Sequence, residues 1–189
     1  MTSDAAAAGL ADHLELAGRI HELLPAAEAA ALEIVRAFER GCRVYTFGNG
    51  GSAADAMHLA EELVGRFRRD RRPLPAQSLS ADASALTCIA NDYSFDEVFE
   101  RQVRAFVRSG DVAVAFSTSG RSTNVVRGLA AARTAGATTV LLTGGSGGDA
   151  IEHADVALVV PSESTARVQE MHVLLLHLIL EQVDAWAAA

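Results

Sequence analysis

The chain has 189 residues, half of them hydrophobic, and its formal net charge is -8. This length suits one domain with a sizeable core, and the high apolar content argues against intrinsic disorder. The acidic balance excludes a broad basic footprint, so we expect no nucleic-acid partner. The longest late apolar run, VLLLHLIL, is far too short to span a bilayer, and the N-terminus lacks the basic region of a signal peptide. We therefore expect no membrane association.

The two cysteines, Cys42 and Cys88, stand in apolar contexts and give neither a metal-ligand spacing nor a disulfide framework. We expect both to be core thiols in a reducing cytoplasm. One basic cluster, RFRRDRR at residues 66–72, interrupts the acidic chain. It fits a solvated surface loop as well as a loop that faces a phosphate or another subunit.

The first 40 residues predict two helices. Residues 4–24 have amphipathic spacing that Pro25 is expected to stop, and residues 26–40 predict a second helix that ends at Gly41. Residues 43–47 then predict a strand, and residues 52–67 predict a helix with Ser52 as its N-cap. The remaining predicted elements are strands at 76–80, 111–116, 138–143 and 155–160 and helices at 96–107, 124–136 and 167–186.

Apolar strands that alternate with helices imply a parallel sheet covered by helices on both faces. Five strands in this rhythm predict a doubly wound, flavodoxin-like α/β fold. Ligands of such sheets bind at the carboxyl ends of the strands. The glycine- and serine-rich turns of this sequence fall at those ends.

Three strands end in such turns: GNGGS (48–52), STSGRS (117–122) and TGGSGG (143–148). STSGRS offers hydroxyl donors, and the helix after it offers free N–H groups and the positive end of a dipole. Together these make an anion site that needs no lysine. The GxxxxGK[ST] nucleotide motif is absent and no GxGxxG follows the first strand, so a phosphorylated small molecule fits better. Alternatively, these turns do no more than begin helices.

His58 and Glu62 are four residues apart on a predicted helix and share one face, and the spacing leaves Glu61 open as well. The candidates on the closing helix are Gln169, Glu170, His172 and His177. A carboxylate can remove a proton next to a carbonyl, and a histidine can move protons between neighbouring oxygens. The same side chains could bind a divalent ion such as zinc. Surface pairs and buried structural histidines give the same pattern, so the chemistry requires the two helices to meet near the loops.

Residues 91–95, NDYSF, hold two further polar candidates. Asn91 and Asp92 could bind sugar hydroxyls or cap the helix that follows, and the spacing favours the cap.

The segments GNGGSAADAMHLAEEL, ANDYSFDEVF, STSGRSTNVV, LTGGSGG and RVQEMHVLLLH occur in the order and spacing of the phosphoheptose isomerases. The sequence resembles this family of the sugar isomerase (SIS) superfamily over essentially its whole length. The resemblance implies one SIS domain over residues 1–189, with an N-terminal helical hairpin at 1–40 used in assembly of a homotetramer with interfacial active sites. It implies a cytoplasmic isomerase of heptose biosynthesis that converts sedoheptulose 7-phosphate to D-glycero-D-manno-heptose 7-phosphate through an enediol.

The resemblance also assigns roles to individual residues. It implies that Glu62, rather than Glu61, and His177 are catalytic, and that one zinc ion per subunit is held by His58, Glu62, Gln169 and His177. The substrate-binding residues that it implies are Asn49, Gly50, Gly51, Ser52, Glu62, Asn91, Asp92, Ser117, Thr118, Ser119, Ser122 and Gln169.

Two positions depart from the family pattern. Arg121 stands where the family usually has asparagine, and Ala166 replaces an aspartate that is present in some members and is proposed to touch substrate. Another ketose phosphate therefore remains an alternative substrate. A different class of function is a non-catalytic SIS protein that senses a sugar phosphate or binds a replication-initiator-type partner. The partner-binding branch lacks the matching glutamate and late histidine, which this sequence keeps as Glu62 and His177.

Overall fold

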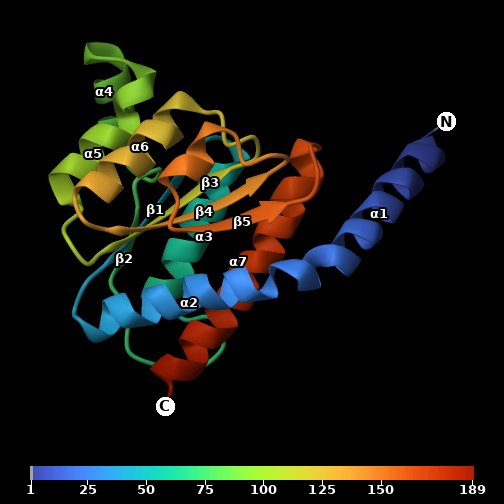
Figure 1. Ribbon diagram of the computed structural model, residues 1–189, viewed down its shortest axis with the longest axis horizontal. Coiled ribbons are helices and arrows are strands. Elements are labelled where there is room, and N and C mark those ends of the chain that lie inside the picture. The colour runs from blue at the N-terminus through green and yellow to red at the C-terminus, as the bar shows by residue number, and fades with distance from the viewer. Residues whose placement is uncertain (1) are drawn as a thin grey trace.

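Figure 1 shows the computed structural model of the protein, which describes residues 2–189 and the side chains from Asp4 onward. Its centre is a five-stranded parallel sheet in the order β2-β1-β3-β4-β5. The strands are β1 (Val44–Gly48), β2 (Ala76–Ser78), β3 (Val112–Ser117), β4 (Thr138–Gly144) and β5 (Val156–Val160). This order confirms the predicted flavodoxin-like α/β fold.

The α-helices are α1 (Thr2–Arg19), α2 (Leu24–Glu39), α3 (Gly51–Val64), α4 (Ala83–Asp92), α5 (Val98–Phe106), α6 (Thr123–Thr134) and α7 (Thr165–Ala187). Short 3-10 helices, η1 (Ile20–Leu23), η2 (Phe95–Glu97) and η3 (Asp149–His153), lie between them. No helix in the described part of the chain is long and apolar enough to cross a bilayer.

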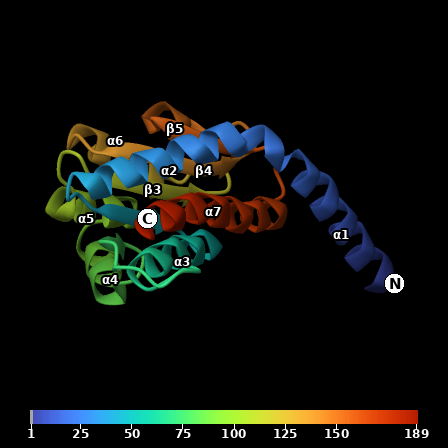
Figure 2. The same cartoon turned by 90° about the horizontal axis from the view of Figure 1, so that it is seen from below.

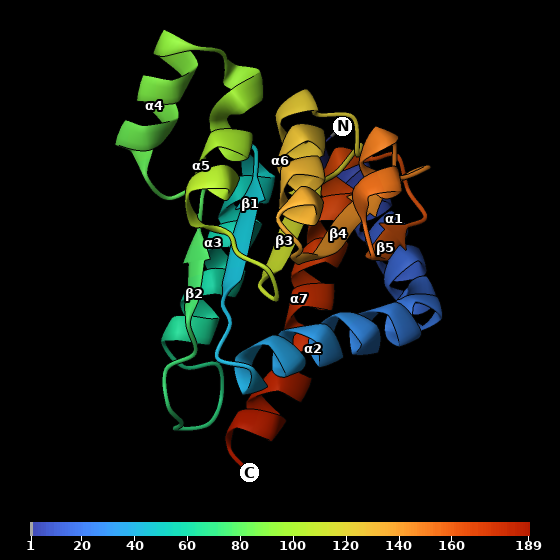
Figure 3. The same ribbon diagram turned by 60° about the vertical axis from the view of Figure 1, so that its left-hand side comes forward.

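The central strand β3 shows how the sequence builds a core on each face of the sheet. Val112, Val114 and Phe116 belong to one buried cluster, whereas Ala113 and Ala115 belong to the other. Successive strand side chains point to opposite faces, so this alternation follows from strand geometry. Helices α2, α3 and α7 cover the first face, and α5 and α6 cover the second (Figures 2 and 3).

The N-terminal region differs from the predicted hairpin. Helix α1 ends at Arg19, and Pro25 stands in the first turn of α2 rather than at the end of the first helix. Proline is tolerated in a first turn because its missing N–H would have no partner there. Figures 1 and 2 show α1 continuing outward from the domain instead of folding back along α2. The prediction of a hairpin at residues 1–40 is therefore wrong in its geometry.

Two further predictions about local structure are corrected. Ser52 is not the N-cap of α3, because Gly50 occupies that position and Ser52 lies buried inside the helix. Cys88 is exposed on α4 and Cys42 is only half-buried, so neither is a core thiol, although both are free.

Helix α4 was not among the predicted elements. Its N-terminus is capped by Asp82, whose carboxylate accepts hydrogen bonds from the N–H groups of Ser84 and Ala85 at 2.9 and 3.0 Å. None of its residues is fully buried, and its apolar face is short, formed by Leu86, Ile89 and Ala90, which pack against the second buried cluster. Because Asn91 and Asp92 form its last turn, they do not cap the following helix.

The loops after β3 and β4 touch each other through glycine backbone. Gly120 has a φ of +63°, and a Cβ atom there would overlap the carbonyl group of Gly147. In turn, a Cβ atom on Gly148 would lie 2.5 Å from the carbonyl carbon of Gly120. Only glycine allows both loops to approach so closely at the carboxyl ends of the strands.

We expect Gly120→Ala to lower the free energy of unfolding by about 3 kcal/mol or more, since it combines a left-handed φ with a backbone overlap. Gly41→Ala is the matched control, because Gly41 has a φ of +75° and open space around its Cβ position. This control should lose only about 1 kcal/mol. Urea denaturation of both variants tests the difference, and equal losses would show that the loop contact has no energetic effect.

Candidate active site

The site begins where α3 leaves β1. Gly50 caps α3 with a φ of +56°, and Gly51 opens the helix. The carboxamide of Gln169, on α7, lies directly on Gly51, where a Cβ atom would displace it. The start of α3 and the start of α7 are therefore in contact beside the GNGGS loop.

Further along the same two helices, α3 and α7 bring together the predicted acid–base residues. His58 Nε2 lies 3.6 Å from Glu62 Oε1, and the rings of His58 and His177 are 5.1 Å apart in an edge-to-face arrangement. The side chain of Glu62 is 18% exposed and that of His58 is 32% exposed, so both remain open to a ligand. Phe67 stacks on the other side of the His177 ring, with 5.6 Å between centroids. The two helices therefore meet, and the cluster lies about two turns along them from the GNGGS loop.

The electrostatics of this cluster favour a neutral imidazole. The pKa of His177 lies below its ordinary value because burial disfavours the imidazolium and His58 adds positive charge, against the opposing effect of Glu62. A neutral imidazole can accept a proton or donate a lone pair to a metal ion. Ligand atoms of His58, Glu61 and Glu62 also lie within 4.8 Å of one another, although Glu61 is exposed.

The serine-rich loop lies between β3 and α6. The hydroxyl of Ser117 accepts a hydrogen bond from Gly120 N–H at 3.1 Å, and that of Ser119 accepts one from Arg121 N–H at 3.2 Å. Ser122 is the N-cap residue of α6, but its hydroxyl makes no capping bond. A groove of about 230 Å³ runs beside this loop, lined by Thr118, Ser119, Arg121, Gly144, Gly145, Ser146, Glu163 and Thr165. Donors that could hold an anion are thus concentrated at the start of α6.

The remaining predicted binding residues occupy two separate places. Asn49 exchanges two hydrogen bonds with Asn124, at 2.8 and 2.9 Å, which ties the GNGGS loop to α6. Asn91 and Asp92 bond to each other on exposed α4, which packs against α5 and η2. The structure therefore brings His58, Glu62, Gln169 and His177 to one pair of helices, whereas Asn91 and Asp92 stay on α4.

Comparison of the sequence with known proteins identifies the family of the chain. The sequence model of the SIS domain family matches residues 11–144. The phosphoheptose isomerase of Aquifex aeolicus (strain VF5) is 52% identical over 151 residues, which cover 80% of this chain and 79% of that protein. The chain belongs to the phosphoheptose isomerase family of SIS-domain proteins.

Solved structures from the same family have the same fold over nearly the whole chain. Phosphoheptose isomerase GmhA from Neisseria gonorrhoeae superposes with a TM-score of 0.93 at 39% identity, covering 98% of this chain and 100% of that one. A phosphoheptose isomerase from Francisella tularensis gives a TM-score of 0.94 at 31% identity, with coverages of 98% and 99%. The extent of the SIS domain beyond residues 11–144 stays a prediction.

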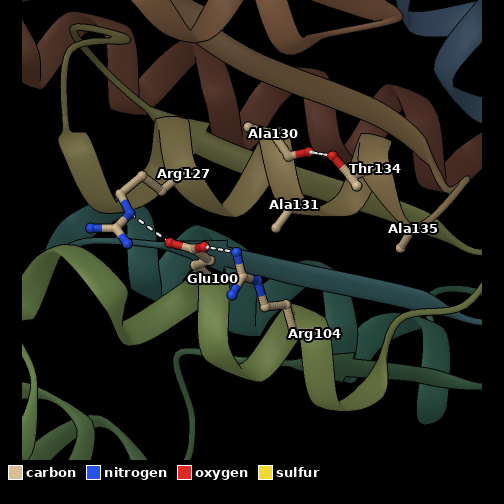
Figure 4. Close-up of a pocket in the computed structure, with 7 residues that line it drawn as sticks. All are labelled: Glu100, Arg104, Arg127, Ala130, Ala131, Thr134 and Ala135. Carbon is tan, nitrogen blue, oxygen red and sulfur yellow. Dashed lines mark hydrogen bonds and ion pairs between the residues drawn. The ribbon is translucent and has the colours of Figure 1, made fainter.

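Another groove in this SIS-domain chain lies away from these residues. It measures about 400 Å³ and runs between α5 and α6, lined in part by Arg104 and Arg127 (Figure 4). Both arginines pair with the carboxylate of Glu100 at 2.5 Å, and Arg127 also lies 3.7 Å from a carboxylate oxygen of Glu97, so the two positive charges face two negative ones. This groove contains none of the predicted site residues, and we do not assign it a ligand.

Sequence reasoning named His172 as a candidate but missed its buried partner Asp55, which lies on the same helix as His58. The fully buried ring of His172 places its Nδ1 4.0 Å from Oδ2 of Asp55, and neither atom has a hydrogen-bond partner among the described residues. Burial raises the pKa of Asp55 to about 6, and it lowers the pKa of His172 to about 4. At neutral pH His172 is therefore uncharged, and the two side chains do not form an ion pair. Asp55 precedes His58 by three residues, which was the one sequence signal for it.

These shifts predict opposite pH dependences of stability. The folded state binds the Asp55 proton more tightly than the unfolded chain does, so this carboxyl destabilises the fold as pH rises from about 4 to about 6. The pKa of His172 is lower in the folded state than in the unfolded chain. The folded state therefore loses stability as pH falls from about 6.5 to about 4.

We expect Asp55→Asn to raise the free energy of unfolding by about 2 kcal/mol at pH 7.5, because it removes a buried carboxylate. The gain should shrink toward pH 4.5, where Asp55 is already protonated in the wild type. Urea denaturation at both pH values tests this, with Asp149→Asn, at an exposed position, as the control. A gain of the same size at both pH values would contradict the assigned cause.

Proposed function

We propose that this chain interconverts sedoheptulose 7-phosphate and D-glycero-D-manno-heptose 7-phosphate, the activity of a phosphoheptose isomerase. The observation that carries the proposal is the contact between the His58–Glu62 face of α3 and His177 of α7, which lies about two turns along these helices from the glycine loop. The 52% identity to a relative named phosphoheptose isomerase supports the same reaction class. A sensor or a partner-binding SIS protein would not require this acid–base cluster.

The chemistry follows from two groups, the Glu62 carboxylate and the His177 imidazole. In the ketose, the Glu62 carboxylate removes a proton from C1, and the C1–H electron pair forms the C1–C2 double bond of an enediol while O2 gains a proton. Returning the proton to C2 and removing the proton from O1 gives the aldose, with no net gain or loss of protons. His177, kept neutral by its surroundings, moves the proton between the two oxygens.

The two loops hold the substrate for this transfer. We assign phosphate binding to Ser117, Thr118, Ser119 and Ser122. The N-terminus of α6 and the groove beside the loop support this assignment. We assign sugar binding to Asn49, Gly50, Gly51, Ser52, Asn91, Asp92 and Gln169. Arg121 lines the same groove as Thr118 and Ser119, so its side chain stands where it can add a contact to the phosphate. Ala166 leaves the substrate without a carboxylate at that position, and exposed Ala166 fills no other role.

A divalent metal fits the donors of this site. His58, Glu62 and His177 offer imidazole nitrogens and carboxylate oxygens, which are ligand types that zinc accepts. Gln169, whose carboxamide lies on Gly51 nearer the start of the two helices, is the fourth donor that the family resemblance implies. His58 and Glu62 already lie 3.6 Å apart, and the His177 ring packs against His58. When bound, zinc would polarise the carbonyl of the ketose.

Assembly and location complete the proposal. Leu10 and Leu14 of the projecting helix α1 are 59% and 62% exposed, which leaves an apolar surface for another subunit to cover. We assign this surface to a homotetramer with active sites at the subunit interfaces. Two free thiols and no disulfide among the described residues are consistent with a cytoplasmic enzyme.

We expect Glu62→Gln to lower kcat at least 1,000-fold, because an amide cannot accept the carbon-bound proton. Purified protein is incubated in heavy water with sedoheptulose 7-phosphate, and proton and mass spectra follow product formation and solvent deuterium at C1 and C2. Glu61→Gln, one residue away and exposed, is the matched control and should keep wild-type turnover within a few fold. Wild-type activity in Glu62→Gln would overturn the mechanism, and an inactive wild type would overturn the function.

We expect the purified chain to bind one zinc ion per subunit and His177→Ala to bind it 10- to 100-fold more weakly, since one nitrogen donor is lost. Isothermal titration with zinc measures both affinities without reference to turnover. His21→Ala, at an exposed position of η1, serves as the control. Equal affinity in wild type and His177→Ala would remove His177 from the ligand set.

A further inference from the structure

The basic segment, residues 66–72, is a sequence feature that the proposed function does not use. It leaves the C-terminus of α3 and runs along the second half of α7. Phe67 stacks on His177, Arg68 pairs with Glu181 at 2.9 Å, and Arg72 lies 5.4 Å from the centroid of the Trp186 ring. The segment is therefore a surface loop with five exposed residues that also contacts α7 at several points along its length.

Arg71 is the buried member of this segment. Its side chain is 1% exposed, and its Nε lies 3.2 Å from Oδ1 of Asp184, which is 4% exposed. The other carboxylate oxygen of Asp184 accepts the backbone N–H of Arg69 at 3.2 Å. A guanidinium and a carboxylate taken out of water in this way are costly unless each is fully hydrogen-bonded. Arg71 and Asp184 therefore form a buried, hydrogen-bonded ion pair and not a surface contact.

The remaining donors of Arg71 bind the end of α3. Its Nη2 donates to the carbonyl of Glu62 at 2.7 Å, and its Nη1 donates to the carbonyl of Leu63 at 3.0 Å. The last carbonyls of a helix have no partner within the helix, and a cation beside them also meets the negative end of the helix dipole. Arg71 thus closes the turn of α3 that carries Glu62, and it does so while anchored to α7 through Asp184.

Asp184 and His177 are seven residues apart on α7, which places them on the same face two turns apart. One bridge therefore links the backbone of Glu62 to the helix of His177. Phe67, at the start of the same segment, stacks on the His177 ring itself. Proton transfer depends steeply on the separation of the reacting groups, and a shift of about 1 Å can cost about 100-fold in rate.

We propose that Arg71, held by Asp184, is a positioning residue for the isomerisation, fixing the last turn of α3 so that the Glu62 carboxylate faces His177. This inference rests on the proposed function, because it concerns the geometry of the same two side chains. The phosphate loop on β3 and α6 lies outside the bridge. Loss of Arg71 therefore affects the chemical step and leaves substrate binding largely intact.

The test compares the wild type with Arg71→Lys, which keeps the charge but loses the planar fork of donors. We expect kcat for sedoheptulose 7-phosphate to fall 10- to 100-fold, with KM changed by less than about threefold. Arg69→Met is the control from the same segment, because the side chain of Arg69 is exposed and only its backbone N–H meets Asp184. This control should retain wild-type kcat and KM.

A second variant separates positioning from stability. In Arg71→Met/Asp184→Leu the buried pair is replaced by apolar side chains, an exchange that often preserves or raises stability. The melting temperature should recover relative to Asp184→Asn alone, whereas kcat should stay low because the carbonyl of Glu62 loses the Arg71 donor.

Two outcomes would overturn the inference while leaving the function in place. These are an Arg71→Lys kcat within twofold of an active wild type, or a kcat restored together with stability in the double variant. A third outcome, no isomerisation by either the wild type or Arg69→Met, would overturn the proposed function and the inference with it.

Discussion

The packing of α3 against α7 is the constraint on which the candidate site depends. The two helices lie on the same face of the sheet and share one core, to which Leu59, Leu63 and Leu175 contribute fully buried side chains. They run in the same direction, so that Gly51 meets Gln169 near their beginnings and His58 meets His177 further along. Apolar contacts along the seam bring a carboxylate and two imidazoles together. Without them, nothing in either helix alone would hold these groups face to face.

The fold was accessible from the sequence because its signals are local. A buried parallel strand requires apolar side chains on both faces, and residues 111–116 show this directly. The glycine- and serine-rich turns mark the carboxyl ends of the strands, where ligands of such sheets bind. The spacing of His58 and Glu62 on one helix face was equally local. Their contact with His177 was not, since it arises between segments more than a hundred residues apart.

The features that sequence reasoning missed depend on tertiary contacts or on weak local signals. Asp55 and His172 face each other only because α3 and α7 pack, and each looks like an ordinary polar residue in its own helix. Gly50 is the N-cap of α3, at a backbone turn with a positive φ. The preference for serine at N-caps does not predict this turn. Helix α4 has ten residues and only a short apolar face, and the outward path of α1 depends on the direction in which η1 leaves α2. Composition and periodicity do not encode such directions.

The glycine contacts also bear on which substitutions the chain can accumulate. Gly51 meets the side chain of Gln169, so a larger residue at 51 could be accommodated by a smaller one at 169. Gly120 and Gly148 meet each other's backbone, which no side-chain replacement can withdraw. The first contact allows compensating pairs of changes, whereas the second allows none. Sequence drift can therefore remodel the helix contact beside the sugar site, while the crossing of the two loops beside the phosphate groove is fixed for as long as this backbone persists.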